Sequence, residues 1–421
     1  MENYGVILVL MTVVIGLSAW AEKIRISYPV ILVIAGIIIG CIPSMPPVEI
    51  SPEIVLLLFL PPLLYDAAFN ISFQSFRNNL NTISTLAIGL VFLTAAGIAA
   101  LTHYIIPGMT WPLSFVLGAI LAATDAVAAI SITKNLGLSH TTTTILEGES
   151  LINDASALVA YRFAVAAVAG SGFVLWKAGL IFWLLIIGGV GIGIGMSRVL
   201  GFVLRSSRHS HLAVLSFLLL APFVTYLIAE MAHVSGVIAV ITMGLGISKL
   251  SSRVFPDFIK TQSKTLWDIV GFLLNGLIFI LLGLELPVVL RTIDKTLVLP
   301  YIGYAFLITA VALLIRMVRV FMQRRNLQRA YHSKKGRIVK EALLSIQECL
   351  IISWSGMRGI VSLAMAIGLP KTVESGVPFP MRSTIIFLAT IVVLITIVGQ
   401  GLILPVIVKR NSTTNQGQMK I

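Results

Sequence analysis

The chain has 421 residues, of which 57% are hydrophobic and only 11% are charged. Soluble domains carry about 25% charged residues, so the composition excludes a water-soluble globule, and with it a cytosolic enzyme, a disordered tail protein and a nucleic-acid-binding protein. The formal net charge of +13 therefore has to be explained by where the basic residues lie along the chain.

Thirteen stretches are predicted to be membrane-spanning helices, because about 20 mostly apolar residues cross the hydrocarbon core. In chain order they lie near residues 4–20, 28–43, 53–70, 82–106, 112–132, 143–169, 175–204, 211–229, 233–248, 266–288, 298–321, 342–369 and 383–408. The first stretch lacks a basic N-terminal region and a cleavage site of small residues, so we interpret it as a span and not as a signal peptide. We expect an all-α polytopic membrane protein with one integral membrane domain.

The basic residues predict the orientation of these spans. If the N-terminus lies outside, most of the 30 Lys and Arg fall in inner loops, with a dense run over 324–340, as the positive-inside rule requires. The basic excess thus indicates topology and contact with lipid headgroups, and no nucleic-acid partner is expected. The odd number of spans places 409–421 in the cytoplasm as a short tail, too short for a regulatory domain. The lack of a signal or transit peptide favours the plasma membrane of a bacterium or an archaeon.

Neither the cysteines nor a nucleotide motif indicates a cofactor. Cys41 and Cys349 both lie inside apolar runs, which favours neither a disulfide framework nor a metal cluster. The sequence contains no GxxxxGKS or GxxxxGKT string, so no ATP site is expected. We expect no cofactor and no enzymatic activity.

Polar groups at membrane depth are costly and usually face a cavity or one another, and four spans contain such groups. In the third span the pair Pro61 and Pro62 precedes Asp66 by about one turn. Prolines free backbone carbonyls, and the carboxylate is expected at or near membrane depth. The alternative is that Asp66 lies near the cytoplasmic helix end, where water caps it.

The fifth span contains Thr124 and Asp125 among small residues. Small residues allow helix backbones to approach closely, and Thr and Asp supply the oxygen ligands that hard cations prefer. The alternative interpretation is that the pair caps the N-terminus of a second half-helix. The two interpretations are compatible, because a capped break at membrane depth is where transporters form ion sites.

The sixth span contains the strongest signal, the run from Glu147 to Ala157. Ser150 and Asp154 are four residues apart and so share one helix face, with Asn153 beside them. Because the helix continues as an apolar run, Asp154 is expected to lie several turns from water on one side. Desolvation and a bound cation act on such a carboxylate in opposite directions, so it can carry either a proton or a metal ion. The alternative is a structural aspartate with satisfied hydrogen bonds.

The twelfth span has an arginine, Arg358, between Gly356 and Gly359. The glycines weaken the helix and the arginine places a fixed charge at depth, so we expect Arg358 to balance helix ends or carboxylates from other spans. Arg316, in the eleventh span, is a second deep arginine. Glu149 of the sixth span is its expected partner, because an unpaired buried charge would cost several kcal/mol.

The two interrupted spans, the fifth and the twelfth, are seven spans apart and therefore cross the membrane in opposite directions. Interrupted helices at matching positions of inverted repeats indicate a transporter site at the membrane midplane. Half-helix ends carry partial charges, which Asp125 and Arg358 are placed to compensate.

Six strings carry a resemblance to a known family: FLPPLLYDAAF (59–69), ATDAVAA (123–129), EGESLINDASALVAY (147–161), HVSGVIAVITMGLGIS (233–248), NGLIFILLGLEL (275–286) and WSGMRGIVSLAMA (354–366). Over nearly its whole length the chain resembles the monovalent cation/proton antiporters of the NhaP and sodium/proton exchanger type. The resemblance implies an NhaA-like antiporter fold of thirteen spans, with inverted repeats and two interrupted, crossing helices.

The resemblance also implies a homodimer with elevator-like alternating access, in which a core part moves against a dimerisation part. The dimerisation part is expected mainly in the spans near 4–106, apart from what 53–106 contributes to the core, and in 175–248. The core part is expected mainly in 53–169 and 266–408.

Roles at the ion site follow from the resemblance, residue by residue. Asp154 would be the carboxylate that binds a cation or a proton, and Asn153 before it marks the electroneutral branch of the family. The Thr124 carbonyl and Ser150 would help to coordinate Na⁺, with Asp125 at the helix crossing.

Four further residues complete the expected site. Asp66 resembles the acidic residue that follows the family's proline pair and is grouped with the ion-binding residues. Glu149 and Arg316 would form a buried ion pair, and Arg358 would neutralise the break in the twelfth span. The chain departs from many members at Ala126, where they have proline.

The residues and the resemblance together predict secondary antiport of Na⁺ or Li⁺ against H⁺, one for one, by competition for a single carboxylate and in support of pH homeostasis. Exchange of K⁺ for H⁺ by the same fold is the alternative, because ligand type does not fix the cation radius. A cation channel, which belongs to another class, would show ungated flux that does not depend on pH. A non-transporting scaffold would have no use for polar groups at membrane depth.

Overall fold

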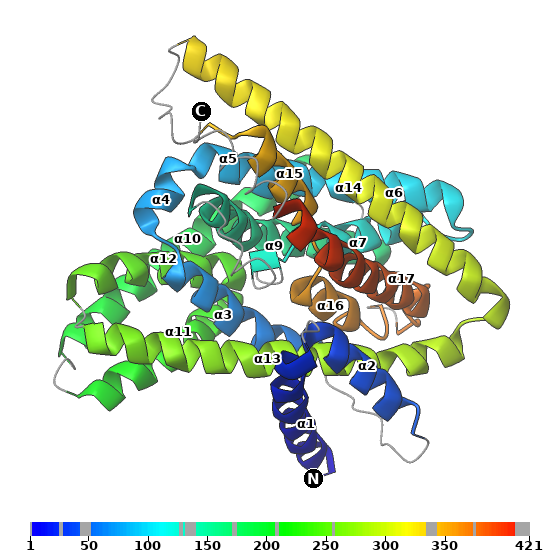
Figure 1. Cartoon of the computed structure of the whole chain (residues 1–421), viewed down its shortest axis with the longest axis horizontal. Coiled ribbons are helices and arrows are strands. Elements are labelled where there is room, and N and C mark those ends of the chain that lie inside the picture. The colour runs from blue at the N-terminus through cyan, green and yellow to red at the C-terminus, as the bar shows by residue number, and fades with distance from the viewer. Residues whose placement is uncertain are drawn as a thin grey trace. The chain divides into compact units, whose positions relative to one another are not determined.

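The computed structural model describes residues 2–24, 28–42, 52–125, 129–130, 140–170, 175–206, 210–254, 257–333, 343–373 and 376–408 (Figure 1). Within these residues the regular structure is helical, apart from an isolated antiparallel bridge between Thr372 and Pro378. Contacts divide the chain into two compact units. The first unit comprises 1–49, 78–169 and 276–421, and the second comprises 50–77 and 170–275.

The first unit carries most of the polar residues singled out above. Its helices are α1 (Glu2–Ile24), α2 (Tyr28–Gly40), α5 (Leu80–Ser84), the π-helical turn η1 (Thr85–Gly89), α6 (Leu90–Ile105), α7 (Trp111–Ala122), α9 (His140–Val168), α14 (Lys295–His332), α15 (Ile346–Trp354), α16 (Ile360–Ile367), α17 (Arg382–Ile395) and the π-helical turn η3 (Thr396–Gln400).

The second unit consists of α3 (Pro52–Asn70), α4 (Phe73–Asn78), α10 (Leu175–Ser206), α11 (His211–Met231) and α12 (Gly236–Val254). The long helix α13 (Asp257–Thr292) begins in this unit and ends in the first one. Within the second unit α12 packs against α10, α3 and α11, and the rings of Tyr65 and Trp267 lie 5.0 Å apart between α3 and α13.

Seven helices in the described part of the chain are long and apolar enough to cross a membrane. They are Leu80–Ile105, Thr141–Val168, Trp183–Ser206, His211–Met231, Phe258–Thr292, Lys295–His332 and Arg382–Val408, and four shorter apolar helices accompany them: Leu8–Ala19, Ile31–Gly40, Trp111–Ala122 and Gly236–Leu250. A polytopic, helical membrane protein is thus confirmed, while the count of thirteen spans stays a prediction.

The eleventh predicted span lies within a helix that is longer than the apolar stretch. The apolar pattern predicts an end near 321, but α14 continues to His332. Its last turns contain Arg, Gln, Leu and Ala, all good helix formers, so the helix continues into the basic run.

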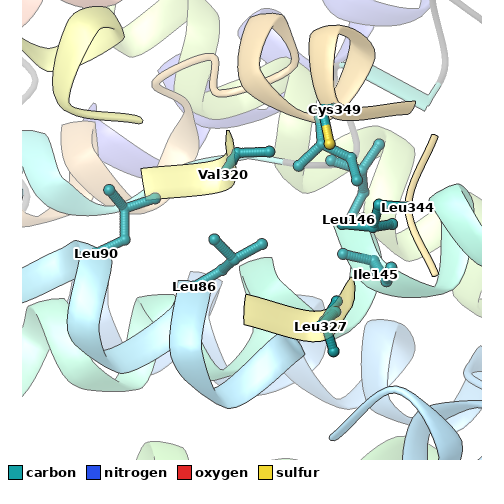
Figure 2. Close-up of a cluster of buried hydrophobic side chains, with 9 residues drawn as sticks. Leu86, Leu90, Ile145, Leu146, Val320, Leu327, Leu344 and Cys349 are labelled. Atoms are coloured by element: carbon teal, nitrogen blue, oxygen red, sulfur yellow. The ribbon is translucent and has the colours of Figure 1, made fainter. Parts of the chain in front are cut away.

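A cluster of buried apolar side chains fixes the helices that hold the site (Figure 2). Leu86 and Leu90 meet Ile145 and Leu146 of α9, and the cluster also contains Val320, Leu327, Leu344, Cys349 and Ile352. It therefore joins η1 and α6 to α9, α14 and α15. Cys349 is a free, buried thiol in this cluster, and Cys41 is free and exposed.

Candidate ion-binding site

The fifth and twelfth spans are both interrupted, as predicted. Helix α7 ends at Ala122, and the chain runs on without helical hydrogen bonding from Ala123 to Asp125. The twelfth span divides into α15 and α16, with 355–359 between them. The two breaks are in contact, because the Asp125 backbone N–H donates to the Met357 carbonyl at 2.8 Å. The departure at Ala126 lies outside the described residues.

Arg358 lies on the carbonyl end of α7. Its Nη1 donates to the carbonyl oxygens of Ala122 and Ala123 at 3.1 and 3.2 Å, and only 3% of the residue is exposed. A helix C-terminus carries a partial negative charge, so the guanidinium stabilises it. Arg358 thus compensates a helix end from another span, as the residues predicted, and this end belongs to the fifth span.

Asp125 lies near a helix N-terminus, whereas Arg358 lies near a helix C-terminus. Gly359 is the residue that precedes α16, and a Cβ at Gly359 would overlap the Asp125 carboxylate. The carboxylate therefore approaches the N-terminus of α16, which carries a partial positive charge. Glycine is required at 359 because no side-chain atom fits between the two segments.

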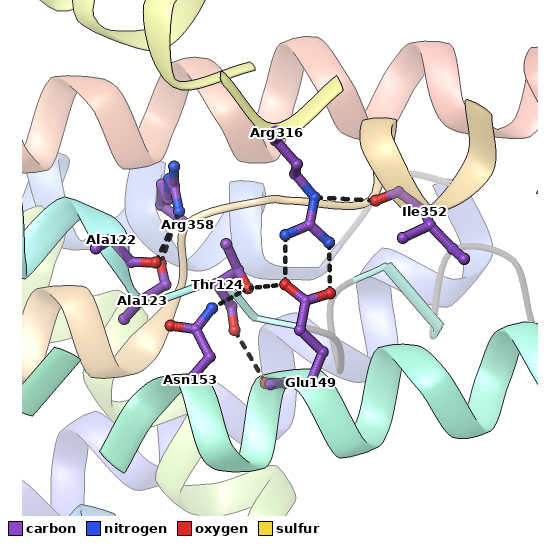
Figure 3. Close-up of polar contacts among 9 residues, drawn as sticks. Ala122, Ala123, Thr124, Glu149, Asn153, Arg316, Ile352 and Arg358 are labelled. Carbon is purple, nitrogen blue, oxygen red and sulfur yellow. Dashed lines mark hydrogen bonds and ion pairs between the residues drawn. The ribbon is translucent and has the colours of Figure 1, made fainter. Parts of the chain in front are cut away.

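Glu149 and Arg316 form the predicted buried ion pair (Figure 3). Nη1 and Nη2 of Arg316 donate to Oε1 and Oε2 of Glu149 at 2.5 and 2.7 Å, and the side chains are 3% and 1% exposed. Arg316 Nε also donates to the Ile352 carbonyl at 2.9 Å, near the C-terminus of α15. Each interrupted span thus has one arginine on the carbonyl end of its first half-helix.

Thr124 connects the break in the fifth span to α9. Its carbonyl oxygen accepts from Ser150 Oγ at 2.9 Å, and its hydroxyl contacts the Asn153 amide at 2.6 Å. With the amide turned over from its orientation in Figure 3, Asn153 makes three hydrogen bonds. Its Nδ2 then donates to the Ala122 carbonyl at 3.2 Å, and its Oδ1 accepts from the Thr124 backbone N–H at 3.3 Å and from the Thr124 hydroxyl. This orientation satisfies both ends of the amide.

Asp154 is one turn further along α9 than Ser150. The residue is 8% exposed, and its Oδ1 is buried without a hydrogen-bond partner in the part of the chain that the structure describes. Buried polar atoms normally have partners, so this oxygen is available to a proton or a cation. A carboxylate, the Ser150 hydroxyl and the Thr124 carbonyl are oxygen donors of the type that hard cations bind.

Asp66 differs from the other predicted residues because it belongs to the second unit. It lies in α3, which stays helical through the buried Pro61 and Pro62. Its Oδ1 accepts from Asn70 Nδ2 at 2.7 Å. The other eight predicted residues lie in the first unit, on α9, α14 and the two breaks. The division into dimerisation and core parts stays a prediction, because a dimerisation part is defined by a second copy of the chain.

Two hydroxyl groups at the breaks were missed by the sequence analysis. Thr396 Oγ1 accepts from the Arg358 backbone N–H at 3.1 Å, and Ser362 Oγ donates to the Ala123 carbonyl at 3.3 Å. Both are hydroxyl residues inside apolar helical runs. Such residues more often bond to their own helix, so the only available signal was weak.

Residues 8–410 match the family model described as "Sodium/hydrogen exchanger, transmembrane". The chain belongs to this family. The predicted resemblance is thereby confirmed.

Several curated relatives are antiporters by name. The chain is 35% identical over 368 residues to the "Sodium, potassium, lithium and rubidium/H(+) antiporter" of Bacillus subtilis, and the match covers 85% of this chain and 54% of that protein. It is 32% identical to the "Na(+)/H(+) antiporter ApNhaP" of Aphanothece halophytica, over 86% of this chain and 66% of the relative. The chain thus spans about half the length of the Bacillus relative.

A solved structure has the same fold. The sodium proton antiporter MjNhaP1 from Methanocaldococcus jannaschii matches with a TM-score of 0.76 at 20% sequence identity, over 97% of this chain and 98% of that one. The exchanger family and the MjNhaP1 fold agree with the polytopic antiporter architecture expected from the sequence.

Proposed function

We propose that this protein is a secondary antiporter that exchanges Na⁺, with Li⁺ as an alternative cargo, for H⁺ across a cell membrane. The observation that carries the proposal is the buried Oδ1 of Asp154, which has no partner among the described residues and lies one helical turn along α9 from Ser150, whose hydroxyl donates to the Thr124 carbonyl. Membership of the sodium/hydrogen exchanger family supports it, as do relatives named as cation/proton antiporters.

The proposed mechanism is competition for Asp154. When deprotonated, the carboxylate binds the cation together with Ser150 and Thr124, and when protonated it is neutral and releases the cation. Lowering the pH should therefore raise the apparent KM for Na⁺, because protons occupy the same group. The maximal rate should be recovered at high Na⁺ concentration.

Further features of this proposal come from the resemblance and, for the orientation and the absence of a cofactor, from the sequence itself. Asn153 adds no second titrating charge, so one cation would move per proton. A homodimer would expose the site alternately to the two faces by elevator-like movement, with the N-terminus outside and the C-terminus in the cytoplasm. We propose no cofactor and no enzymatic reaction, and a contribution to pH homeostasis.

The decisive experiment is exchange in proteoliposomes. Purified protein with a trapped pH-sensitive dye should respond to added Na⁺ or Li⁺, and Asp154→Asn should abolish the response while the protein still inserts and elutes as a folded species. A response retained by Asp154→Asn would overturn the proposal. Flux that is ungated and independent of pH would identify a channel.

A K⁺/H⁺ antiporter is the second candidate. It is favoured by two Bacillus relatives whose names include potassium and rubidium. Adding K⁺ and Rb⁺ to the same assay distinguishes the candidates by the ratio of maximal rate to KM for each ion.

A further inference from the structure

The break in the twelfth span is held from one side by η3. Beyond its contact with Arg358, Thr396 donates its hydroxyl proton to the Val393 carbonyl at 2.9 Å. Trp354, the last residue of α15, donates Nε1–H to the Gln400 carbonyl at 3.2 Å. The π-helical turn therefore contacts the chain just before the break, at Trp354, and inside it, at Arg358. Such turns inside long helices occur frequently at functional sites.

A small cavity lies between α14, η3 and this break. Its volume is about 10 Å³, and its polar lining comes from Thr309, Arg316, Arg358, Thr396 and Gln400. This volume is close to that of one water position. Gln400 is 6% exposed, and its Oε1 has no hydrogen-bond partner in the described part of the chain.

The polar groups that line this cavity determine which small molecule or ion it can bind. Gln400 Oε1 is an acceptor and needs a donor, whereas guanidinium groups only donate. A halide would be repelled by the amide oxygen, and a second cation would be repelled by the two arginines. A water molecule can donate to Gln400 and accept from a guanidinium at once.

We propose that the cavity binds one ordered water, which joins the Gln400 amide to the arginine guanidinium groups, and that Gln400 is a positioning residue for the ion site. The second part rests on the proposed function. Arg358 also holds the carbonyls of Ala122 and Ala123, which directly precede Thr124. Fixing the guanidinium therefore fixes the backbone that presents the Thr124 carbonyl to a cation.

Two variants of equal length separate the polar role of Gln400 from its packing. Gln400→Met fills the same space without an acceptor, and Gln400→Glu keeps the acceptor oxygens. A structure of the full chain, at a resolution that shows ordered water, should contain one density peak in the cavity for the unmodified protein and for Gln400→Glu, and none for Gln400→Met. An empty cavity in the unmodified protein would overturn the water site.

Transport assays test whether Gln400 is a positioning residue. In proteoliposomes Gln400→Met should raise the KM for Na⁺ about three- to tenfold, the effect expected when one hydrogen bond is lost, while the maximal rate changes much less. Gln400→Glu should keep a KM closer to that of the unmodified protein. Equal KM values for Gln400→Met and the unmodified protein would overturn the positioning role. If the unmodified protein exchanges no cation, the proposed function fails, while the water peak still decides the site.

Discussion

Arg316 makes three hydrogen bonds to two different helices, and this arrangement determines what its partner Glu149 contributes. Two of the bonds go to Glu149 on α9 and the third goes to the Ile352 carbonyl on α15. A buried ion pair adds little net stability, but removing one partner leaves an uncompensated charge. We therefore expect the loss of Glu149 to affect the folding of the protein more directly than ion exchange.

Glu149→Ala should lower stability by about 3–5 kcal/mol, the range for breaking a buried pair, and should lower the yield of folded protein. Thermal unfolding in detergent, followed by size-exclusion chromatography, measures this. The double variant Glu149→Leu with Arg316→Met removes both charges and should recover much of the loss. A normal yield of Glu149→Ala with lost transport would argue against a structural role.

Ser150 and Ser156 form a matched pair on α9. The Ser150 hydroxyl donates to the Thr124 carbonyl, whereas the Ser156 hydroxyl donates to Ile152 of its own helix at 2.9 Å. Ser150→Ala should raise the KM for Na⁺ in proteoliposomes by about tenfold, because one proposed ligand and one hydrogen bond are lost. Ser156→Ala should leave the KM nearly unchanged. Equal effects of the two variants would remove Ser150 from the ligand set.

The sequence was sufficient to predict the polar residues of the first unit, because carboxylates, arginines and amides are rare in apolar runs and each needs a partner. It identified the pairing of Glu149 with Arg316 because those two charges had few alternatives. It did not identify Thr396 or Gln400, because a hydroxyl or amide in a membrane helix can bond within its own helix. Their roles depend on which helix lies beside the break, and spacing along the chain does not encode that.

At the scale of the elements, the interrupted spans depend on backbones that touch. The residue types predicted both breaks, since Gly356, Gly359 and the Thr-Asp pair are weak helix formers. They did not predict where each half-helix ends, and the length of α14 shows that good helix formers extend a helix past its apolar part.

Gly359→Ala should disrupt the contact between the two breaks, since a Cβ at 359 would overlap the Asp125 carboxylate. We expect lost exchange and a stability lower by about 1–3 kcal/mol, the usual cost of overpacking. Gly303→Ala in α14 is the control, because a Cβ there meets nothing within 4 Å. Exchange and unfolding temperature measure both variants, and unchanged exchange in Gly359→Ala would contradict the described contact.

Helix α13 contains a second matched pair of glycines. A Cβ at Gly283 would overlap the backbone of α2 at Val33 and Gly36, whereas a Cβ at Gly271 meets nothing within 4 Å. Gly283→Ala should lower the unfolding temperature in detergent, because it separates two backbones in contact. Gly271→Ala should raise stability by up to about 1 kcal/mol, the difference in helix propensity. A higher unfolding temperature for Gly283→Ala than for Gly271→Ala would show that α2 and α13 do not approach closely in the first unit.

At the scale of the whole molecule, the proposed stoichiometry concerns net charge. Asp154 is the proposed shared carboxylate, and its neighbour Asn153 is an amide that bonds to Thr124 and Ala122. An amide does not titrate. The cation and the proton would therefore each carry one positive charge, in opposite directions, and the full cycle would move no net charge.

The exchange rate should therefore be independent of membrane potential. A potential of 100 mV acts on one net charge with about 2.3 kcal/mol, which would change the rate many-fold if the cycle were electrogenic. Proteoliposomes with an imposed diffusion potential should give the same initial rate of Na⁺-driven pH change at either polarity. A rate that follows the potential would show that a second charge moves.

The hydrogen bond from the Asp125 N–H to the Met357 carbonyl joins two main-chain groups, so alanine substitutions do not remove it. Replacing Asp125 by its α-hydroxy analogue through nonsense suppression would exchange that single amide for an ester and leave every side chain intact. This one-atom change would remove the N–H that donates to Met357, which no side-chain substitution other than proline removes.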